Sequence, residues 1–112
     1  MKQTLMSYVV ATVVLMGTPS ASAQSSAADG EKLFAAQKCT ICHSVAGQGN
    51  KKGPLDGVGA KLSADDIRLW ITQAPDMAAK AKAERKPAMK AYTSLSKAEV
   101  DALVAFVQSL KK

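Results

Sequence analysis

The sequence is poor in the residues that crosslink small domains or bind metals. It contains only two cysteines and one histidine, and aromatic residues make up 4% of it. Cys39 and Cys42 lie so close together that a disulfide between them would close too short a loop to stabilise the fold. A structural zinc site needs four ligands and is poorly supported without a third cysteine or a second histidine. The few aromatic residues and the modest positive charge argue against a nucleic-acid-binding protein.

The sequence also lacks a hydrophobic run long enough to span a membrane, which takes about 20 apolar residues. The longest run, residues 8–16, ends at a Gly-Thr-Pro-Ser sequence. Because Lys2 precedes the run and Ala21-Ser22-Ala23 offers a small-residue cleavage site, residues 1–23 are predicted to be a secretory signal peptide. One domain, residues 24–112, then remains and is expected in the periplasm, with no membrane insertion of the mature chain. An uncleaved membrane anchor is the less favoured alternative.

No segment of the mature chain alternates apolar and polar residues as a strand would, and no internal repeat is found, so an all-α fold is predicted. The glycine-rich segment 46–60 is predicted to be a loop. Four segments have helical caps, spacing or composition. The first begins at the Ser26 cap and runs into Cys39, and the second begins at the Ser63 cap and ends before Pro75. The third is a weak helix signal over residues 78–84. The fourth begins at the Ser96 capping box.

The motif Cys39-Thr40-Ile41-Cys42-His43 carries the clearest chemical signal. Its two thiols have the spacing that matches two vinyl groups of a haem, and the adjacent imidazole can reach the iron from below, so the motif predicts one covalently attached haem c with His43 as the proximal ligand. A thioredoxin-like dithiol would require a β-α-β pattern, which is absent. A bound cofactor also supplies the core that so short a chain lacks.

The sixth iron ligand is sought among the methionines, because the chain has no second histidine. Three of the five methionines belong to the predicted signal peptide, which leaves Met77 and Met89. Pro87 biases the chain before Met89 toward an extended path across a haem face, whereas Met77 leads into a helix-prone run. Met89 is therefore favoured and Met77 is the runner-up. A packing role for either methionine, and an open or lysine-ligated iron, remain alternatives.

The order of these features resembles a known family. An N-terminal helix with Gly30 and Phe34 comes first, the Cys39 to His43 motif follows, then Gly53-Pro54-Leu55, and last a segment from Met89 to Ser96 that leads into the final helix. In this order the mature chain resembles the class I monohaem c-type cytochromes of bacteria, over nearly its whole length. The resemblance implies a small all-α cytochrome c fold with a haem-filled core.

The resemblance also implies roles for single residues. Gly30 and Phe34 should cross the C-terminal helix at Leu103 and Phe106, and Pro54 should pack on His43 and accept a hydrogen bond from it. Met89 matches the family's distal methionine, although proline more often follows that methionine directly. Trp70 and Tyr92 are taken as packing residues that can also contact the haem.

Ligation by both His43 and Met89 would leave the iron no site for a substrate, so an electron carrier is predicted rather than an enzyme. Without Lys2 the chain has 14 basic and 9 acidic side chains, a net charge of +5. The cations nearest Met89 are expected to steer redox partners with acidic docking surfaces, the alternative being a merely solvated face. They are Lys80, Lys82, Arg85, Lys86 and Lys90. The alternative functions are a haem c subunit of a periplasmic oxidoreductase and an open-site haem sensor or peroxidase.

Overall fold

The computed structural model describes residues 11–14, 17 and 22–112, and the side chains of its first helix from Ser26 onward. The predicted signal peptide, residues 1–23, falls mostly outside the described residues. The described part of the chain is mostly helical and has one short two-stranded hairpin. In chain order the elements are α1 (Ser22–Ala36), the 3-10 turn η1 (Cys39–Ile41), β1 (Ser44–Val45), β2 (Gln48–Gly49), α2 (Val58–Lys61), α3 (Ala64–Thr72), α4 (Ala74–Ala81) and α5 (Lys97–Gln108).

Two of the predicted helix starts are confirmed by their hydrogen bonds. The hydroxyl of Ser63 accepts from the backbone N–H of Asp66 at 3.1 Å, at the start of α3. Ser96 and Glu99 form a reciprocal capping box at the start of α5, with bonds of 3.1 and 2.9 Å. Each cap satisfies backbone donors that a helix N-terminus leaves without a partner.

Other boundaries differ from those predicted. The Ser26 cap is wrong, because α1 begins at Ser22 and Ser26 lies inside it. Helix α4 begins at Ala74, before the predicted start, because Pro75 fits the first turn of a helix, where its missing N–H has no partner to lose. The predicted loop 46–60 contains β2 and the one-turn helix α2, both too short to produce a recognisable period.

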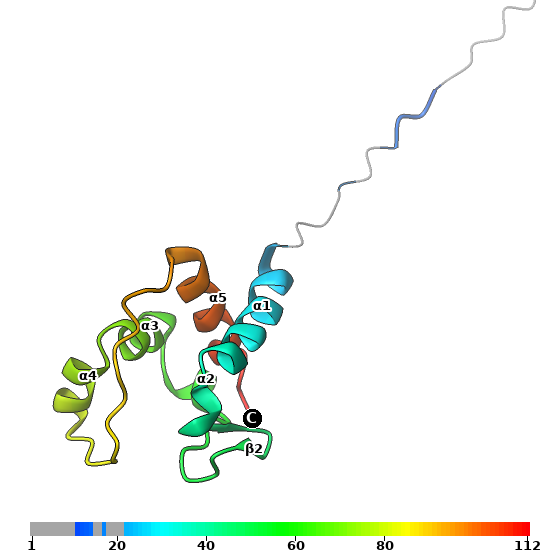
Figure 1. Cartoon of the computed structure of the whole chain (residues 1–112). Coiled ribbons are helices and arrows are strands. Elements are labelled where there is room, and N and C mark those ends of the chain that lie inside the picture. Colours follow the sequence, from blue (N-terminus) through cyan, green and yellow to red (C-terminus); the bar gives the residue numbers. More distant parts are fainter. Residues whose placement is uncertain (1–10, 15–16, 18–21) are drawn as a thin grey trace, which may run out of the picture.

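Helices α1 and α5 cross closely, as Figure 1 shows. Gly30 is buried at the crossing, and a side chain there would collide with the carbonyl oxygen of Ala102 and come within 2.7 Å of Cβ of Phe106. One turn later, the rings of Phe34 and Phe106 pack edge to face, with centroids 5.5 Å apart. The predicted crossing of Gly30 and Phe34 with the C-terminal helix is confirmed, with Ala102 and Phe106 as the direct contacts.

The hydrophobic core is centred on α5, which packs against α1 on one side and α3 on the other. Helix α3 contributes Ile67 and Ile71, whereas Trp70 is half-buried and lies outside the core cluster. The buried residues of α5 are Val100, Ala102, Leu103, Val104, Phe106 and Val107. Among the described helices none is both long and apolar enough to cross a membrane.

Residues 82–96 form a long connection that returns from the end of α4 to α5 (Figure 1). It has no regular secondary structure, but the backbone N–H of Tyr92 donates to the carbonyl oxygen of Ile71 in α3 at 2.9 Å. Tyr92 and Leu95 are half-buried against the core. The connection is therefore held against the body of the protein near its C-terminal end.

Replacing Gly30 with alanine should destabilise the protein, although alanine is the better helix former by about 1 kcal/mol. The added methyl group would force α1 away from Ala102, and overpacking of this kind costs about 1–3 kcal/mol. Denaturant unfolding of the purified variant measures the change. As a control, Ala28→Gly at an exposed position of α1 should lose about 1 kcal/mol through helix propensity alone. A Gly30→Ala variant as stable as the parent would contradict the close crossing.

Asp101 should stabilise the fold in a pH-dependent way. Its carboxylate accepts from Arg68 of α3 at 2.6 Å and from Lys97 at 2.8 Å. Hydrogen bonds from Lys97 and Arg68 lower its pKa from the usual 3.8. A carboxyl whose pKa is lowered by folding contributes stability above its unfolded pKa and loses it as the pH falls through the folded one. Asp101→Asn should therefore lower the unfolding midpoint at neutral pH, and the difference should shrink as the pH falls below 3.8 toward the lower pKa of the folded protein. A pH-independent difference would contradict the ion pairs.

Candidate functional site

The turn after α1 gathers the Cys39 to His43 motif into one compact unit. Lys38 adopts a left-handed conformation, with φ 60°, and so turns the chain out of the helix. The backbone N–H groups of Cys42 and His43 then both donate to the carbonyl oxygen of Cys39, at 3.1 and 2.9 Å. Cys39 and Cys42 are partly buried free thiols. Helix α1, anchored on α5 by Gly30 and Phe34, therefore fixes where the two thiols stand.

The ring of His43 is held by one hydrogen bond, in which Nδ1 donates to the carbonyl oxygen of Gly53 at 3.0 Å. Within the described part of the chain, Nε2 has no hydrogen-bond partner and is free to bind a metal. Burial lowers the pKa of His43, and the nearby charge of Arg85 lowers it further, against the opposing effect of the Gly53 bond. A lowered pKa favours the neutral imidazole, which is the form in which histidine binds metals.

The acceptor of this bond corrects one expectation. The resemblance assigned it to Pro54, but the carbonyl oxygen involved is that of Gly53, one residue earlier. Pro54 itself is exposed. It forms a bridge to Ser44, and the carbonyl of Ser44 accepts from the N–H of Leu55 at 2.9 Å. This pairing holds the loop beside the motif and aims the Gly53 carbonyl at the histidine ring.

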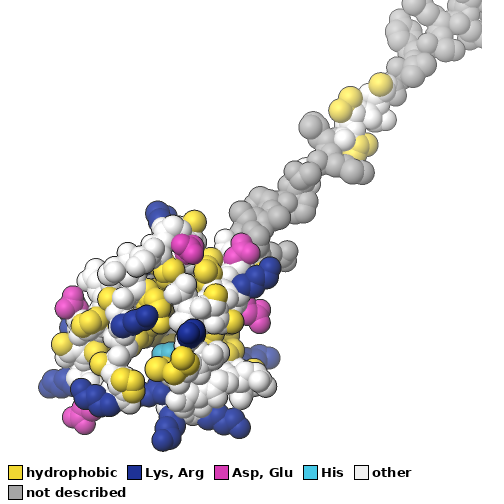
Figure 2. All heavy atoms as spheres, viewed as in Figure 1, with side chains coloured by type: hydrophobic (Ala, Val, Ile, Leu, Met, Phe, Trp, Pro, Cys, Tyr) yellow, Lys and Arg dark blue, Asp and Glu magenta, His cyan; other side chains and the backbone are white. Residues whose placement is uncertain are grey.

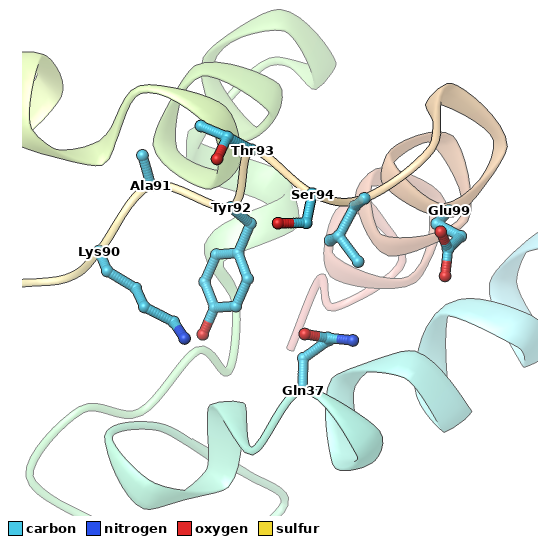
Figure 3. Close-up of a pocket in the computed structure, with 8 residues that line it drawn as sticks. Gln37, Lys90, Ala91, Tyr92, Thr93, Ser94 and Glu99 are labelled. Carbon is cyan, nitrogen blue, oxygen red and sulfur yellow. The ribbon is translucent and has the colours of Figure 1, made fainter.

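His43 is partly buried, and the face of the molecule seen in Figure 2 carries several hydrophobic side chains. The side chains of Cys39 and Tyr92 lie close together at the site. Burial raises the pKa of the Cys39 thiol, and the Tyr92 contact partly opposes that shift. The ammonium group of Lys90 lies 5.0 Å from the centroid of the Tyr92 ring. Figure 3 shows Lys90 and Tyr92 facing Gln37 across a pocket of about 320 Å³.

The two candidate methionines occupy different environments. Met77 lies within α4, whose contacts are made with α3. Met89 lies in the extended connection 82–96, between Arg85 and Tyr92. Both side chains are half-buried. Trp70, the third predicted haem-packing residue beside Pro54 and Tyr92, is half-buried on α3.

Comparison with known protein families gives one match: the family model for cytochrome c covers residues 27–111. The chain belongs to the cytochrome c family. No curated protein and no solved structure gave a significant match in the corresponding searches. Residues 27–111 include the Cys39 to His43 motif, both candidate methionines and every described element from η1 to α5. The predicted class I c-type cytochrome and its mostly helical fold are confirmed.

The site fits the haem c that members of this family bind covalently. Both thiols of the motif are free to form thioethers, since neither takes part in a disulfide. The hydrogen bond of His43 uses Nδ1, so the nitrogen at the far side of the ring is the one left for iron. Cys39 and Cys42 would hold the porphyrin, and the protein is a haem c electron carrier.

Asn50 is a residue of this cytochrome's site that the sequence did not reveal. Its backbone N–H is shared between the carbonyl oxygens of Thr40 and His43, at 3.0 and 3.1 Å. Its side-chain amide donates to the carbonyl oxygen of Ile41 at 3.0 Å and accepts from the N–H of Lys52 at 3.0 Å. Asn50 therefore satisfies three carbonyl groups of the attachment motif. The surrounding glycines indicated a turn, but nothing in the sequence indicated which carbonyl groups it would meet.

Arg85, expected from the sequence only as one of the steering cations near Met89, also contacts the motif. Its guanidinium donates to the carbonyl oxygen of Cys42 at 2.6 Å, across 43 residues of sequence. Together, Asn50 and Arg85 leave no carbonyl of the motif without a partner, because that of Cys39 accepts within the turn.

Replacing Asn50 with alanine should loosen the attachment turn, because two side-chain hydrogen bonds are lost while the backbone bonds remain. We expect the free energy of unfolding of the haem-loaded protein to fall by about 1–2 kcal/mol, as measured by denaturant titration. Asn50→Asp keeps the acceptor for Lys52 but loses the donor to Ile41, so it should be intermediate or worse. Gln48→Ala, at an exposed position of the same hairpin, should change little. Equal effects of the Asn50→Ala and Gln48→Ala variants would contradict this role.

Proposed function

We propose that this cytochrome carries single electrons in the periplasm on one haem c with His43 and Met89 as its axial ligands. The observation that carries the proposal is the position of the connection 82–96 over the attachment motif. Arg85 donates to the carbonyl oxygen of Cys42, and the backbone N–H of Tyr92 donates to the carbonyl oxygen of Ile71 in α3. The connection is thus tied to the motif at Cys42 and to α3 at Tyr92, and Met89 lies between the two ties.

This arrangement supports Met89 over Met77. A segment tied to the motif at Cys42 and to α3 at Ile71 passes along the edge of the site, so a methionine between the two ties is in a position to approach the face opposite His43. Met77 sits in α4, which packs against α3. An extended segment also lets a side chain turn inward without breaking a helix.

The protein's contribution to electron transfer is to hold the site rigid and dry. Bound haem supplies the one-electron change between ferrous and ferric iron. His43 is fixed in one orientation by Gly53, and a thioether ligand favours the reduced state. Half-buried Leu55 and Tyr92 pack against the core near the motif and limit access of water. With both axial positions held by side chains, no substrate can reach the metal, so we infer a carrier and not an enzyme.

The surface around the site suits an acidic redox partner. The five cations expected near Met89 are all exposed, and Figure 2 shows Lys and Arg side chains outnumbering acidic ones on this face. Ile41, within the attachment motif, is 65% exposed and is the one large hydrophobic side chain between residues 22 and 112 exposed to that degree. The exposed Ile41 side chain would give a partner protein an apolar contact. The surrounding cations would attract an acidic partner and speed its association.

Replacing Met89 with alanine should remove the sulfur-to-iron charge-transfer band of the oxidised protein, while Met77→Ala should retain it. Loss of the thioether should also lower the reduction potential and allow carbon monoxide to bind the reduced protein readily. Optical spectra of the parent and both variants measure this. A band that survives in Met89→Ala, or a parent that binds carbon monoxide readily, would contradict the proposed ligation and favour an open-site protein.

Electron transfer to a small anionic oxidant, hexacyanoferrate, should slow as ionic strength rises, since salt screens the attraction to the basic face. Lys82→Gln with Lys86→Gln should lower the rate at low salt more than Lys111→Gln with Lys112→Gln. The two pairs remove the same charge, but the second pair lies beside Val45 and Asp56, near the C-terminus. Stopped-flow kinetics measure both rates. Equal effects of the two pairs would contradict local steering near Met89.

A further inference from the structure

Arg85 makes a contact that a surface cation kept for solubility or docking does not need. Its Nη2 donates to the carbonyl oxygen of Cys42 at 2.6 Å, although the side chain lies in an exposed part of the connection 82–96. In the part of the chain that the structure describes, no other cation of this connection donates a hydrogen bond to the attachment motif. The bond is charge-assisted, and such bonds are about twice as strong as those between neutral groups.

The loop opposite Arg85 leaves room for its guanidinium. A Cβ atom on Gly53 would collide with Nη1 of Arg85 and with the carbonyl oxygen of Cys42. Gly53 does not have a positive φ, so glycine is needed here for space and not for backbone conformation. The same Gly53 holds His43 through its carbonyl. Arg85, the haem-attachment turn and the loop that orients the histidine therefore meet at one point.

We propose that Arg85 is a positioning residue that fastens the connection carrying Met89 to the haem-attachment turn. The inference rests on the proposed function, because the connection matters for the iron only if Met89 is its ligand. Only three residues, 86–88, separate Arg85 from Met89, so a fixed Arg85 limits how far Met89 can swing outward. Tyr92 supplies a second tie through its N–H bond to Ile71. The methionine is thus restrained from both sides.

The charge of Arg85 has a further consequence. Its guanidinium carries a positive charge. It lies against the carbonyl oxygen of Cys42, the residue next to His43 in the chain. The same charge disfavours the extra positive charge of oxidised iron. Arg85 therefore raises the reduction potential as well as closing the site.

Three variants of the haem-loaded protein separate these effects. Arg85→Gln removes both the charge and the guanidinium donor, and Arg85→Lys keeps the charge. Lys86→Gln removes a neighbouring charge for which the described part of the chain shows no hydrogen bond to the motif. Three measurements are made on each variant: the affinity of the oxidised protein for imidazole, the reduction potential, and deuterium exchange of the amides of residues 88–92.

We expect imidazole to bind Arg85→Gln about three- to tenfold more tightly than the parent. Imidazole must displace Met89, and the variant has lost one hydrogen bond that helps to hold Met89 in place. Amide exchange in residues 88–92 should be faster, and the potential should fall below that of Lys86→Gln. Arg85→Lys should have a reduction potential close to that of the parent. Its affinity for imidazole should lie between those of the parent and Arg85→Gln. If Arg85→Gln and Lys86→Gln behave alike in imidazole affinity and in exchange, the proposal is wrong.

Failure of the proposed ligation would look different. If Met89→Ala retained the sulfur-to-iron band, Met89 would not be the ligand, and imidazole affinity would no longer report on this connection. The exchange of residues 88–92 would still differ between Arg85→Gln and Lys86→Gln if Arg85 fastens the connection. Unchanged exchange in Arg85→Gln beside a lost band in Met89→Ala would refute the positioning role and leave the proposed function intact.

Discussion

The hydrogen bond from Nδ1 of His43 to the carbonyl oxygen of Gly53 is the constraint on which the site depends. It selects the ring nitrogen that remains for iron, and it requires the loop around Gly53 to lie against the attachment turn. That loop is held by pairing with Ser44 and by Asn50, which covers three carbonyl groups of the motif. The orientation of the His43 ring therefore depends on the arrangement of the whole segment from Cys39 to Leu55.

The helix crossing supplies the other half of the architecture. Gly30 lets α1 approach α5 closely, and the Phe34 ring packs against Phe106 one turn later. Because the attachment motif follows directly from α1, this crossing fixes the position of both thiols relative to the core. The long connection 82–96 then completes the site from outside, tied by Arg85 at one end and Tyr92 at the other. Fold and site are thus held by largely separate sets of contacts.

Features encoded by neighbouring residues were predictable from the sequence. The caps at Ser63 and Ser96 depend on side chains three residues apart, and the attachment motif is contiguous. Contacts between distant segments were not predictable, because no local pattern says which carbonyl a side chain will meet. The contacts of Asn50 and Arg85 with the motif were missed for this reason, and the partner of His43 was misplaced by one residue, from Gly53 to Pro54. Short elements such as α2 lack the length to show a period.

The central claim is that Cys39 and Cys42 together hold one haem c, with His43 beneath its iron. The most direct test is the intact mass of the protein after denaturation in acid, which removes any haem that is not covalently bound. The account predicts a mass equal to the polypeptide plus one haem, and loss of the two-thioether optical signature in alkaline pyridine when Cys39 or Cys42 is replaced by alanine. A parent protein that releases all its haem on denaturation, and leaves the mass of the polypeptide alone, would contradict it.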